Sequence, residues 1–414
     1  MDTIFAEATP VGRGGVSVIR LSGPEARRMA EALAGGLPEP RYAYFRALRD
    51  AGELIDHALV LWFAAGASFT GEEAAELQLH GAPVVVRRVA DALRAMGARD
   101  AEAGEFTLRS FMAGRMNLAE VEGLSDLLAA ETEAQRRQAV ALADGALGRL
   151  VESWRADLVQ AGAMLTAAID FVDEEIPDDV AVGVAGIMAR VRASIDGQLA
   201  GFPAADRLRH GFSVAIVGPP NAGKSSLLNY IAQRELAIVT DIPGTTRDVV
   251  EYHADLRGLP VSFLDTAGIR ETDDAVEQIG VTRALERASD ADLRVFLGAV
   301  DGVAVRDEDI ITRSKGDLTG EAGAISATTG QGMAELLDQV YDILSQRMSS
   351  AGLVVSGRQA KELKTASAAL VPSDEPEIAS ENIRRALHSL ARLIGSVDAE
   401  DYLDVVFSSF CIGK

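Results

Sequence analysis

The sequence predicts a multidomain protein, with an N-terminal α+β domain followed by an α/β domain that lies between two helical regions. Three observations support this prediction. Residues 1–117 alternate short β-like runs with Ala/Arg-rich amphipathic stretches. Residues 118–172 are dense in Ala, Leu, Glu and Arg and contain no proline, and residues 211–349 alternate apolar strands with helical segments. A chain of 414 residues is also longer than a single core usually is.

In the N-terminal domain we expect strands at 16–21, 57–63 and 74–80. Each is a short run rich in β-branched, aromatic or other apolar residues. The stretch 83–96 has the amphipathic spacing of a helix. Strands and helices within one short region indicate an α+β or α/β unit that ends near residue 117.

The middle of the chain is predicted to be helical. Residues 118–172 are expected to form long helices, with breaks at glycines such as Gly145, and a further helical stretch runs to about residue 200. The segment "GFPAADRLRHG" at 201–211 contains Gly and Pro, which predicts a boundary before the next domain. Residues 357–398 are helical again.

The third domain is predicted to hold a parallel sheet that is covered on both faces. Its apolar runs at 212–218, 261–268, 293–300 and 322–326 are mostly continuous rather than alternating, as in strands buried on both sides. Helical segments separate them, which fits crossover connections.

Composition and charge narrow the classes of function. The net charge of −22 argues against non-specific coating of nucleic acid, so an RNA partner would need a local basic patch. The arginines at 87–99, 136–137 and 207–210 are candidates, although each stretch is more simply a solvated helix face. One cysteine allows no intramolecular disulfide and no cysteine-rich zinc site. Without a basic apolar presequence or a long apolar run, a cytoplasmic protein is expected.

The strongest local signal is "GPPNAGKSS" at 218–226, which follows an apolar strand and precedes a helix. It matches the phosphate-loop pattern G-x-x-x-x-G-K-S. Gly218 and Gly223 let backbone N–H groups wrap the β-phosphate. Lys224 brings a cation to the β- and γ-phosphates, and the Ser225 hydroxyl binds Mg²⁺. The strand-loop-helix context disfavours a chance match in a glycine-rich turn.

Further motifs follow in the order of a Ras-like GTPase. "PGTTRD" at 243–248 is placed where a switch segment would offer Thr246 to Mg²⁺, and "DTAG" begins with Asp265 at the end of a strand. "SKGD" at 314–317 and "ISAT" at 325–328 stand where such enzymes bind the base. Asp317 can accept both N1–H and N2–H of guanine, which adenine cannot satisfy, so GTP is the expected substrate.

Two positions depart from the usual pattern. Ser314 stands where guanine-specific GTPases usually carry Asn, so we expect guanine preference to be retained with weaker affinity. Ile269 stands where a Ras-like enzyme carries the glutamine that orients the attacking water. Glu277 is a candidate for that task, although a solvated acid at a helix start is the simpler interpretation from the residues alone.

The residues that we expect to bind GTP belong to these motifs and to the segments beside them. They are Asn221, Ala222, Gly223, Lys224, Ser225, Ser226, Thr240, Thr245, Thr246, Asp265, Thr266, Ala267, Gly268, Lys315, Asp317, Ser326, Ala327 and Thr328. Magnesium is expected at Ser225 and Thr246.

Stretches outside the nucleotide motifs resemble one family. "DTIFAEATPVGRGGVSVIRLSG", "FTGEEAAELQLHG", "GEFTLRSFMAGRMNLAEVEGLSDLL" and the terminal "FCIGK" are similar to the MnmE (TrmE) family of tRNA modification GTPases. The resemblance runs nearly end to end. It implies an N-terminal folate-binding and dimerisation domain at 1–117 and a helical domain built from 118–210 and 350–414. The GTPase domain, 211–349, is then an insertion into the helical domain.

The resemblance also implies partners and a reaction. Family members work as homodimers with a flavoprotein, MnmG (GidA), and place an aminomethyl-type (carboxymethylaminomethyl) group on carbon 5 of the wobble uridine of certain tRNAs. The one-carbon donor is 5-formyltetrahydrofolate or a related tetrahydrofolate. In this interpretation Glu277 orients the hydrolytic water, and potassium stimulates hydrolysis.

The implied ligands of these groups map onto this sequence. Potassium is expected at Asn221, Thr240, Ile242 and Thr245. Folate is expected at Arg20, Glu76, Arg115 and Lys414. An anionic tail held by cations and a pterin ring bound by a carboxylate account for this choice of residues.

Simpler alternatives remain for several of these residues. Asn221 can be a loop-stabilising amide, and Arg20, Glu76 and Arg115, taken singly, can be ordinary salt-bridge formers. Cys411 is either a nucleophile beside the folate or a buried structural thiol.

Two other classes of function share part of the pattern. A ribosome-assembly type of GTPase switch would share residues 211–349, but it has no use for the N-terminal blocks or the tail. An ATP-driven, kinase-like enzyme is opposed by Asp317 and by the "DTAG" segment.

Overall fold

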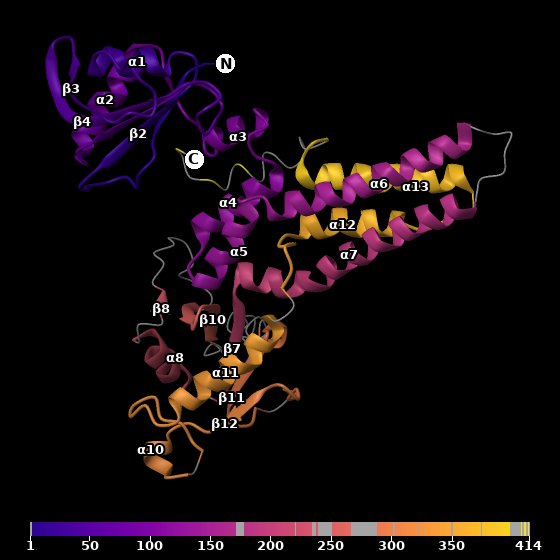
Figure 1. Ribbon diagram of the computed structural model, residues 1–414. Helices are drawn as coiled ribbons and strands as arrows, with labels where there is room; N and C mark the ends of the chain where they lie inside the picture. Colours follow the sequence, from indigo (N-terminus) through magenta and orange to yellow (C-terminus); the bar gives the residue numbers. More distant parts are fainter. Residues whose placement is uncertain are drawn as a thin grey trace, which may run out of the picture. The chain divides into compact units, whose positions relative to one another are not determined.

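The structure is a computed structural model that describes residues 2–170, 178–219, 221–233, 237–238, 251–265, 288–300, 303–321, 323–348, 351–373, 375–397, 407, 410 and 413. The chain divides into two compact units, Met1–Ser125 with Ala391–Lys414, and Asp126–Leu390. Figure 1 draws both units and labels most of their helices and strands. Among the described helices, none is long and apolar enough to cross a membrane.

The first unit is built on a six-stranded sheet. In spatial order its strands are β3 (Tyr44–Asp50), β4 (Glu53–Phe63), β5 (Ala74–Leu79), β2 (Ser17–Ser22), β1 (Ile4–Glu7) and β6 (Arg99–Asp100). Neighbouring strands are antiparallel, except that β1 and β6 are parallel. The helices are α1 (Ala26–Ala34), α2 (Pro83–Ala95) and α3 (Glu105–Met112). The three strands and the helix predicted from the sequence are therefore all present.

One face of this sheet is covered, and the other is partly open. Residues of α1 and α2 share a hydrophobic core with the first face, to which Leu21 and Leu77 belong. On the opposite face, Phe106 of α3 joins a small cluster with residues of β1. Toward β3 that same face leaves Phe45 and Leu59 exposed, at 65% and 42%. The open face is therefore the one available to a ligand or a partner.

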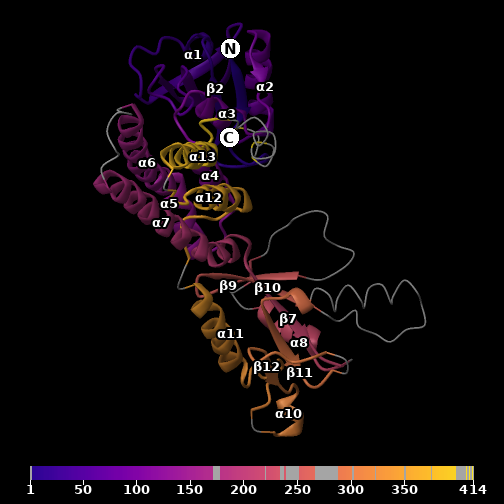
Figure 2. The same cartoon turned by 90° about the vertical axis from the view of Figure 1, so that its right-hand side faces the viewer.

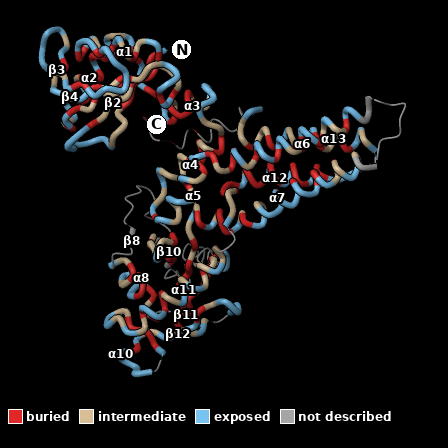
Figure 3. Tube along the Cα trace, in the orientation of Figure 1, coloured by how far each residue is buried: buried red, intermediate tan, exposed pale blue. Residues whose placement is uncertain are grey.

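The second unit contains most of the helical region. Its helices are α5 (Glu133–Ala143), α6 (Ala146–Asp170), α7 (Asp178–His210) and α12 (Gly357–Ala369), while α4 (Leu118–Ala129) and α13 (Pro376–Ile394) each cross the boundary between the units. α6, α7, α12 and α13 lie side by side in both ribbon views (Figures 1 and 2). Buried residues recur along each of these helices, as Figure 3 shows in red.

The end of α7 differs from the prediction. Gly201 and Pro203 do not interrupt the helix, which continues to His210 and ends before Gly211, whose φ is 84°. Side chains of α5 hold these last turns: Gln138 Nε2 donates to Ala205 O at 3.3 Å, and Gln135 Nε2 donates to Arg209 O at 3.2 Å. Arg209 O is one of the carbonyls that a helix end leaves without an intrahelical donor. Tertiary contacts therefore outweigh the local tendency of Pro203 to end a helix.

A second sheet follows α7 directly. Its spatial order is β12 (Ile310–Thr312), β11 (Leu293–Leu297), β7 (Phe212–Val217), β10 (Leu259–Asp265), β9 (Glu251–Leu256) and β8 (Ala237–Ile238). The first four strands are parallel, and β9 and β8 are antiparallel additions. α8 (Lys224–Ala232) and α11 (Met333–Met348) share the larger core with one face. A smaller cluster around Phe296 covers the other face.

The strand predicted at 322–326 is not present in the described residues 323–326. Instead, Ile325 N donates to Arg313 O at 2.7 Å, and Ser326 N donates to Gln331 O at 2.9 Å. Only the one-turn helix α10 (Gly316–Thr319) lies between this segment and β12. A parallel strand needs a crossover of about a dozen residues or more. The shorter connection folds back onto its own loop, which leaves β12 at the edge of the sheet.

A buried ion pair holds the connection between β11 and β12. Arg294 on β11 donates through Nε to Asp309 Oδ1 at 3.0 Å and through Nη2 to Ala304 O at 2.9 Å. The side chains of Arg294 and Asp309 are only 5% and 2% exposed. Burial alone would raise the pKa of Asp309, but the bonds from Arg294 and from the Arg306 N–H outweigh it and lower that pKa. The described residues of this connection contain no helix, and the buried pair ties the connection to β11.

Asp309→Asn should destabilise this part of the protein by about 3 kcal/mol, because it leaves the Arg294 guanidinium buried without a countercharge. The full chain, titrated with urea, should release a bound fluorescent GDP analogue at a lower urea concentration. Glu321→Gln is the matched control, since it breaks the exposed pair Arg313–Glu321 of the same region and should cost less than about 1 kcal/mol. Equal losses in the two variants would contradict the role given to the buried pair.

Candidate functional site

The predicted phosphate loop lies at the carboxyl end of β7, between the neighbouring strands β10 and β11. Asn221 and Gly223 have φ values of 61° and 87°, which let the chain turn sharply before α8 begins. Gly218 packs so closely that a Cβ there would lie 3.2 Å from Leu297 Cβ. The loop therefore has the shape in which successive N–H groups surround an anion at a helix N-terminus.

Lys224 places its cation at this loop. The side chain is largely buried, and Nζ donates to Gly218 O at 2.7 Å and to Pro219 O at 3.1 Å. Ser225 follows in the first turn of α8. A cation held by the loop's own carbonyls lies beside the N–H groups that would bind phosphate. The arrangement can bind a polyphosphate and, through the Ser225 hydroxyl, a magnesium ion.

Other strands of the sheet end at the same edge, because parallel strands share a carboxyl edge. β10 ends at Asp265, and β12 is followed by the segment 314–317. Ser314 lies against the phosphate loop: its Cβ and Oγ are 3.6 and 3.7 Å from the position that a Cβ on Gly223 would occupy. Ser314 makes this contact without a side-chain hydrogen bond among the described residues. Ser314 therefore packs against the phosphate loop, but with the described residues it does not form the side-chain hydrogen bonds that the amide of the usual asparagine could make there.

The two segments expected to bind guanine are joined to each other. Gly316 N donates to Ile325 O at 2.9 Å, and a Cβ on Gly316 would lie only 2.8 Å from Ala324 O. Asp317 follows in the first turn of α10 and is exposed. Ser326 is buried, and its Oγ accepts from Thr329 N at 3.2 Å. Lys315, Ala327 and Thr328 belong to the same two segments, so the structure brings together the residues predicted to contact the base.

Other predicted residues of the nucleotide and cation sites lie outside the described residues. They are Thr240, Ile242, Thr245, Thr246, Thr266, Ala267, Gly268 and Glu277. The described residues contain no group of three or more His, Cys, Asp and Glu side chains that could hold a metal. Of the expected cation ligands, Ser225 and Asn221 are described. Both offer an oxygen, the kind of ligand that hard cations prefer.

A cavity of about 370 Å³ lies in the first unit. Arg20 on β2 and Glu76 on β5 face each other in the sheet register and both line it. Their side chains are bonded, with Nε to Oε1 at 3.0 Å and Nη2 to Oε1 at 2.9 Å. Three phenylalanines complete much of the wall, namely Phe63, Phe69 and Phe106. Aromatic walls beside an arginine and a carboxylate suit a flat heterocycle with hydrogen-bonding edges.

The last described residues of the chain approach this cavity. Arg20 Nη1 lies 3.5 Å from Gly413 O, and a Cβ on Gly413 would lie 2.7 Å from Glu7 O. Phe407 and Phe410 are buried in a cluster with residues of α3 and α4. The predicted site residues Cys411 and Lys414 lie outside the described residues, but Gly413 stands between them in sequence.

The structure does not bring Arg115 into the lining of this cavity. Its Nη1 donates to Gly66 O at 2.8 Å, and its Cγ lies 3.5 Å from the position of a Cβ on Gly71. It therefore lies against the loop that forms one cavity wall.

Sequence reasoning missed Arg41, which lines the cavity and forms no ion pair among the described residues. The aromatic and cationic run "RYAYFR" at 41–46 was the available signal.

The arginines considered as RNA contacts are mostly neutralised by nearby acids. Arg136 and Arg137 share Glu133, and their hydrogen bonds lower its pKa to about 2. Further ion pairs in these stretches include Arg88–Asp50, Arg94–Asp100, Arg99–Glu105, Arg207–Asp292 and Arg209–Asp126. These stretches are therefore internally paired helix faces and ends rather than free basic patches, as the simpler interpretation held.

Comparisons with known proteins match this chain to one family. Residues 3–115 match the family described as the GTP-binding protein TrmE N-terminus, and residues 118–411 match the MnmE helical domain. A relative from Paracoccus denitrificans, named tRNA modification GTPase MnmE, is 59% identical over the full length of both chains. A relative of the same name from Roseobacter denitrificans is 49% identical, again over the full length of both.

A solved structure of Era from Aquifex aeolicus is 27% identical to part of this chain. The match covers 40% of this chain and 69% of that one. Its TM-score of 0.26 is too low to establish a shared arrangement.

Proposed function

The chain belongs to the MnmE family of tRNA modification GTPases, and from this membership we propose that it hydrolyses GTP to drive modification of the wobble uridine in certain tRNAs. The modified atom is carbon 5, and the group is of the carboxymethylaminomethyl type. A flavoprotein of the MnmG (GidA) type is the partner, and a tetrahydrofolate supplies the one-carbon unit. The nucleotide edge is the carboxyl edge of the second sheet, where the phosphate loop, Lys224 and the segment 314–317 lie. The observation that supports the proposal most is that one chain carries both this nucleotide edge and the Arg20–Glu76 cavity.

In this proposal the nucleotide is held by its two ends. The phosphate loop and Lys224 bind the phosphates, Ser225 ligates magnesium, and Asp317 accepts the two guanine N–H groups. Ras-like enzymes often use an arginine to neutralise charge in the transition state. Here a potassium ion at Asn221 and at Thr240, Ile242 and Thr245 supplies that charge.

Hydrolysis should be about tenfold faster in potassium chloride than in sodium chloride of the same concentration, because the smaller sodium ion fits the same oxygens less well. Asn221→Ala should remove most of that difference while GTP binding remains. The measurement is phosphate release from the full chain at saturating GTP. Equal rates of the unaltered protein in the two salts would contradict a potassium site.

Glu277→Ala should leave GTP affinity unchanged and reduce turnover by about 100-fold, because the residue orients water rather than binding nucleotide. Binding of a fluorescent, non-hydrolysable GTP analogue and single-turnover hydrolysis separate the two effects. Glu308→Ala, an exposed acid of the same domain, is the control. A variant that still turns over at the normal rate would return Glu277 to the simpler role of a solvated acid.

The cavity in the first unit is the proposed folate site. Phe63 and Phe106 offer flat apolar walls, the Glu76 carboxylate can accept ring N–H groups, and Arg20 supplies a cation. Lys414 would contribute a second cation from the tail, and Arg115 would need a different side-chain arrangement to reach the ligand. Isothermal titration with 5-formyltetrahydrofolate tests this assignment. Cys411 remains either a nucleophile toward the one-carbon unit or a structural thiol.

A second copy of the chain is the proposed partner of the open sheet face. Phe45 stacks on His57 there, and Leu59 on the next strand is also exposed. Exposed apolar groups on one face of a sheet suit an isologous dimer contact, in which the same patch is used twice. With tRNA as the substrate, the working compartment is the cytoplasm. The alternative of a ribosome-assembly switch has no use for a folate site, so binding of folate by the chain would count against it.

A further inference from the structure

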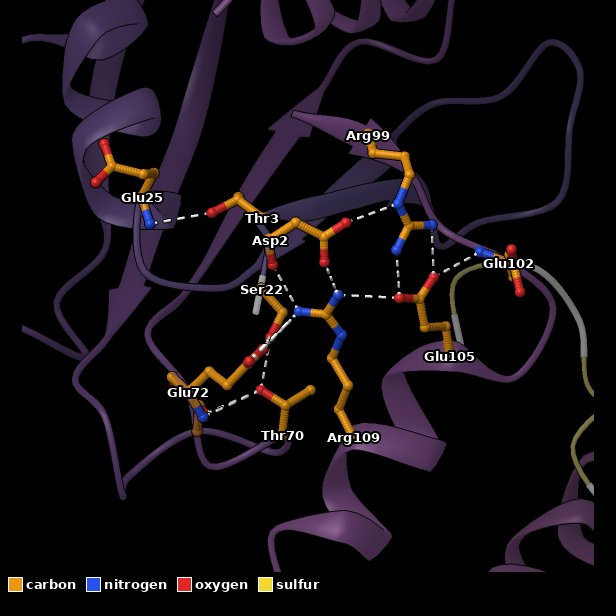
Figure 4. A network of polar contacts seen from close by, with 11 residues as sticks. Asp2, Thr3, Ser22, Glu25, Thr70, Glu72, Arg99, Glu102, Glu105 and Arg109 are labelled. Carbon is orange, nitrogen blue, oxygen red and sulfur yellow. Dashed lines mark hydrogen bonds and ion pairs between the residues drawn. The ribbon is translucent and has the colours of Figure 1, made fainter. Parts of the chain in front are cut away.

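Arg109 on α3 is an almost fully buried cation, with a side-chain exposure of 7%. Figure 4 shows its guanidinium among the carboxylates of Asp2, Glu72 and Glu105. Nη1 lies 3.0 Å from Glu72 Oε2, while Nη2 donates to Asp2 Oδ1 at 2.8 Å and to Glu105 Oε1 at 2.9 Å. Burial alone would lower the pKa of Arg109, but the carboxylates raise it, so the charge is retained.

The bond to Glu72 reaches the loop between β4 and β5. Ser22 Oγ donates to the same carboxylate at 2.7 Å, and Ser68 Oγ donates to Glu72 O at 2.5 Å. Beside Arg109, Ser110 Oγ donates to Phe69 O at 2.9 Å. Residues 67–70 of this loop line the cavity. The loop that forms one wall is therefore anchored to α3 at both Phe69 and Glu72.

The opposite side of the contact also belongs to the cavity. Phe106, which is fully buried and lines the cavity, precedes Arg109 by three residues and so lies on the adjacent turn of α3. Neither Arg109 nor Glu72 lines the cavity. One buried ion pair thus connects the helix that carries one wall with the loop that carries another.

We propose that Arg109 and Glu72 are positioning residues, whose ion pair fixes the loop 66–72 relative to α3 and thereby sets how tightly the cavity holds its ligand. The identity of the ligand as a folate rests on the proposed function, whereas the clamp on the loop does not. Pre-organised walls bind a flat ligand more tightly because less ordering is needed when the ligand enters.

The chain offers a matched control in Arg99. It pairs with the same Asp2 at 2.8 Å and the same Glu105 at 2.7 Å, but it is 44% exposed and makes no contact with Glu72 among the described residues. If the network only stabilised the unit as a whole, changes at either arginine should loosen it to the same extent. If the ion pair fixes the loop, only changes at Glu72 or Arg109 should speed hydrogen exchange of the loop amides and weaken ligand binding.

The experiment uses the full chain with Glu72→Gln, Arg109→Lys and Arg99→Gln. Titration with 5-formyltetrahydrofolate should show about tenfold weaker binding for Glu72→Gln and for Arg109→Lys, in which a single ammonium cannot bridge the same partners. Arg99→Gln should bind within about twofold of the unaltered protein. All three should hydrolyse GTP at the normal rate, because the nucleotide edge is in another unit. Hydrogen exchange without ligand should be faster for amides 66–72 in the first two variants only.

Each outcome bears on a different claim. Unchanged exchange of the loop amides in Glu72→Gln and Arg109→Lys overturns the clamp, and faster exchange with unchanged folate affinity overturns the positioning role. Equal effects of Arg99→Gln would show a purely structural network and overturn it as well. If the unaltered chain does not bind the folate, the proposed folate function fails, while the exchange measurement still decides whether the loop is clamped.

Discussion

Asp317→Asn should change the base preference of the protein from guanine to xanthine. The carboxylate can accept both N1–H and N2–H of guanine, whereas an amide offers one acceptor and turns a donor toward the N2 amino group. Xanthine carries an oxygen at that position, which the amide N–H can meet. With GTP bound, the amide N–H and the guanine N2 amino group would face each other as two donors without an acceptor, which is costly. GTP affinity should therefore fall by about 10³-fold, and hydrolysis of xanthosine triphosphate should appear.

Competition between the two nucleotides for the protein measures this exchange directly. Glu321→Gln is the control, since Glu321 lies four residues along the same short connection and pairs only with the exposed Arg313 in the described part of the chain. It should leave the preference for GTP unchanged. If Asp317→Asn still selects GTP over xanthosine triphosphate, the segment 314–317 does not bind the base.

Lys224→Ala should reduce GTP hydrolysis by about 10³-fold, because it removes the cation nearest to the charge that develops on the phosphates. Nζ already lies at the loop, bonded to Gly218 O and Pro219 O. The measurement is single-turnover hydrolysis at saturating GTP and Mg²⁺. Lys361→Ala removes a lysine from the exposed side of α12 and should have no effect. Normal hydrolysis by Lys224→Ala would remove the basis for a phosphate-loop mechanism in this protein.

The nucleotide edge could be predicted from the sequence because its chemistry fixes both residue types and spacing. A phosphate loop needs glycine at particular backbone positions and lysine at one helix start, and parallel strands must end at one edge. That Ser314 and Gly223 belong to one nucleotide site therefore followed from motif order alone. Their detailed contact did not, because it depends on how the short connection after β12 folds.

Several other features of the fold and of the cavity depend on contacts between residues that are not neighbours in the sequence, so the sequence did not predict them. The edge strand β3 contains Arg46 and Arg49 and has no clear apolar alternation, so it gave little strand signal. The buried pair Arg294–Asp309 places a charge on a central strand, where a hydrophobic residue is the usual expectation. Arg20 and Gly413 come together although they lie at opposite ends of the chain. Such contacts have no local signature, and the resemblance of the terminal segments to a family pointed only to the approach of the tail to Arg20.

The nucleoside composition of tRNA tests the central claim most directly. The host strain should be deleted for this protein and then supplied with the unaltered chain, with Lys224→Ala or with Lys361→Ala, and digested tRNA should be analysed by mass spectrometry. The deletion should remove the wobble uridine that carries the carboxymethylaminomethyl-type group. The unaltered chain and Lys361→Ala should restore it, and Lys224→Ala should not. A modified nucleoside that persists unchanged in the deletion strain would contradict the proposal that this GTPase drives the modification.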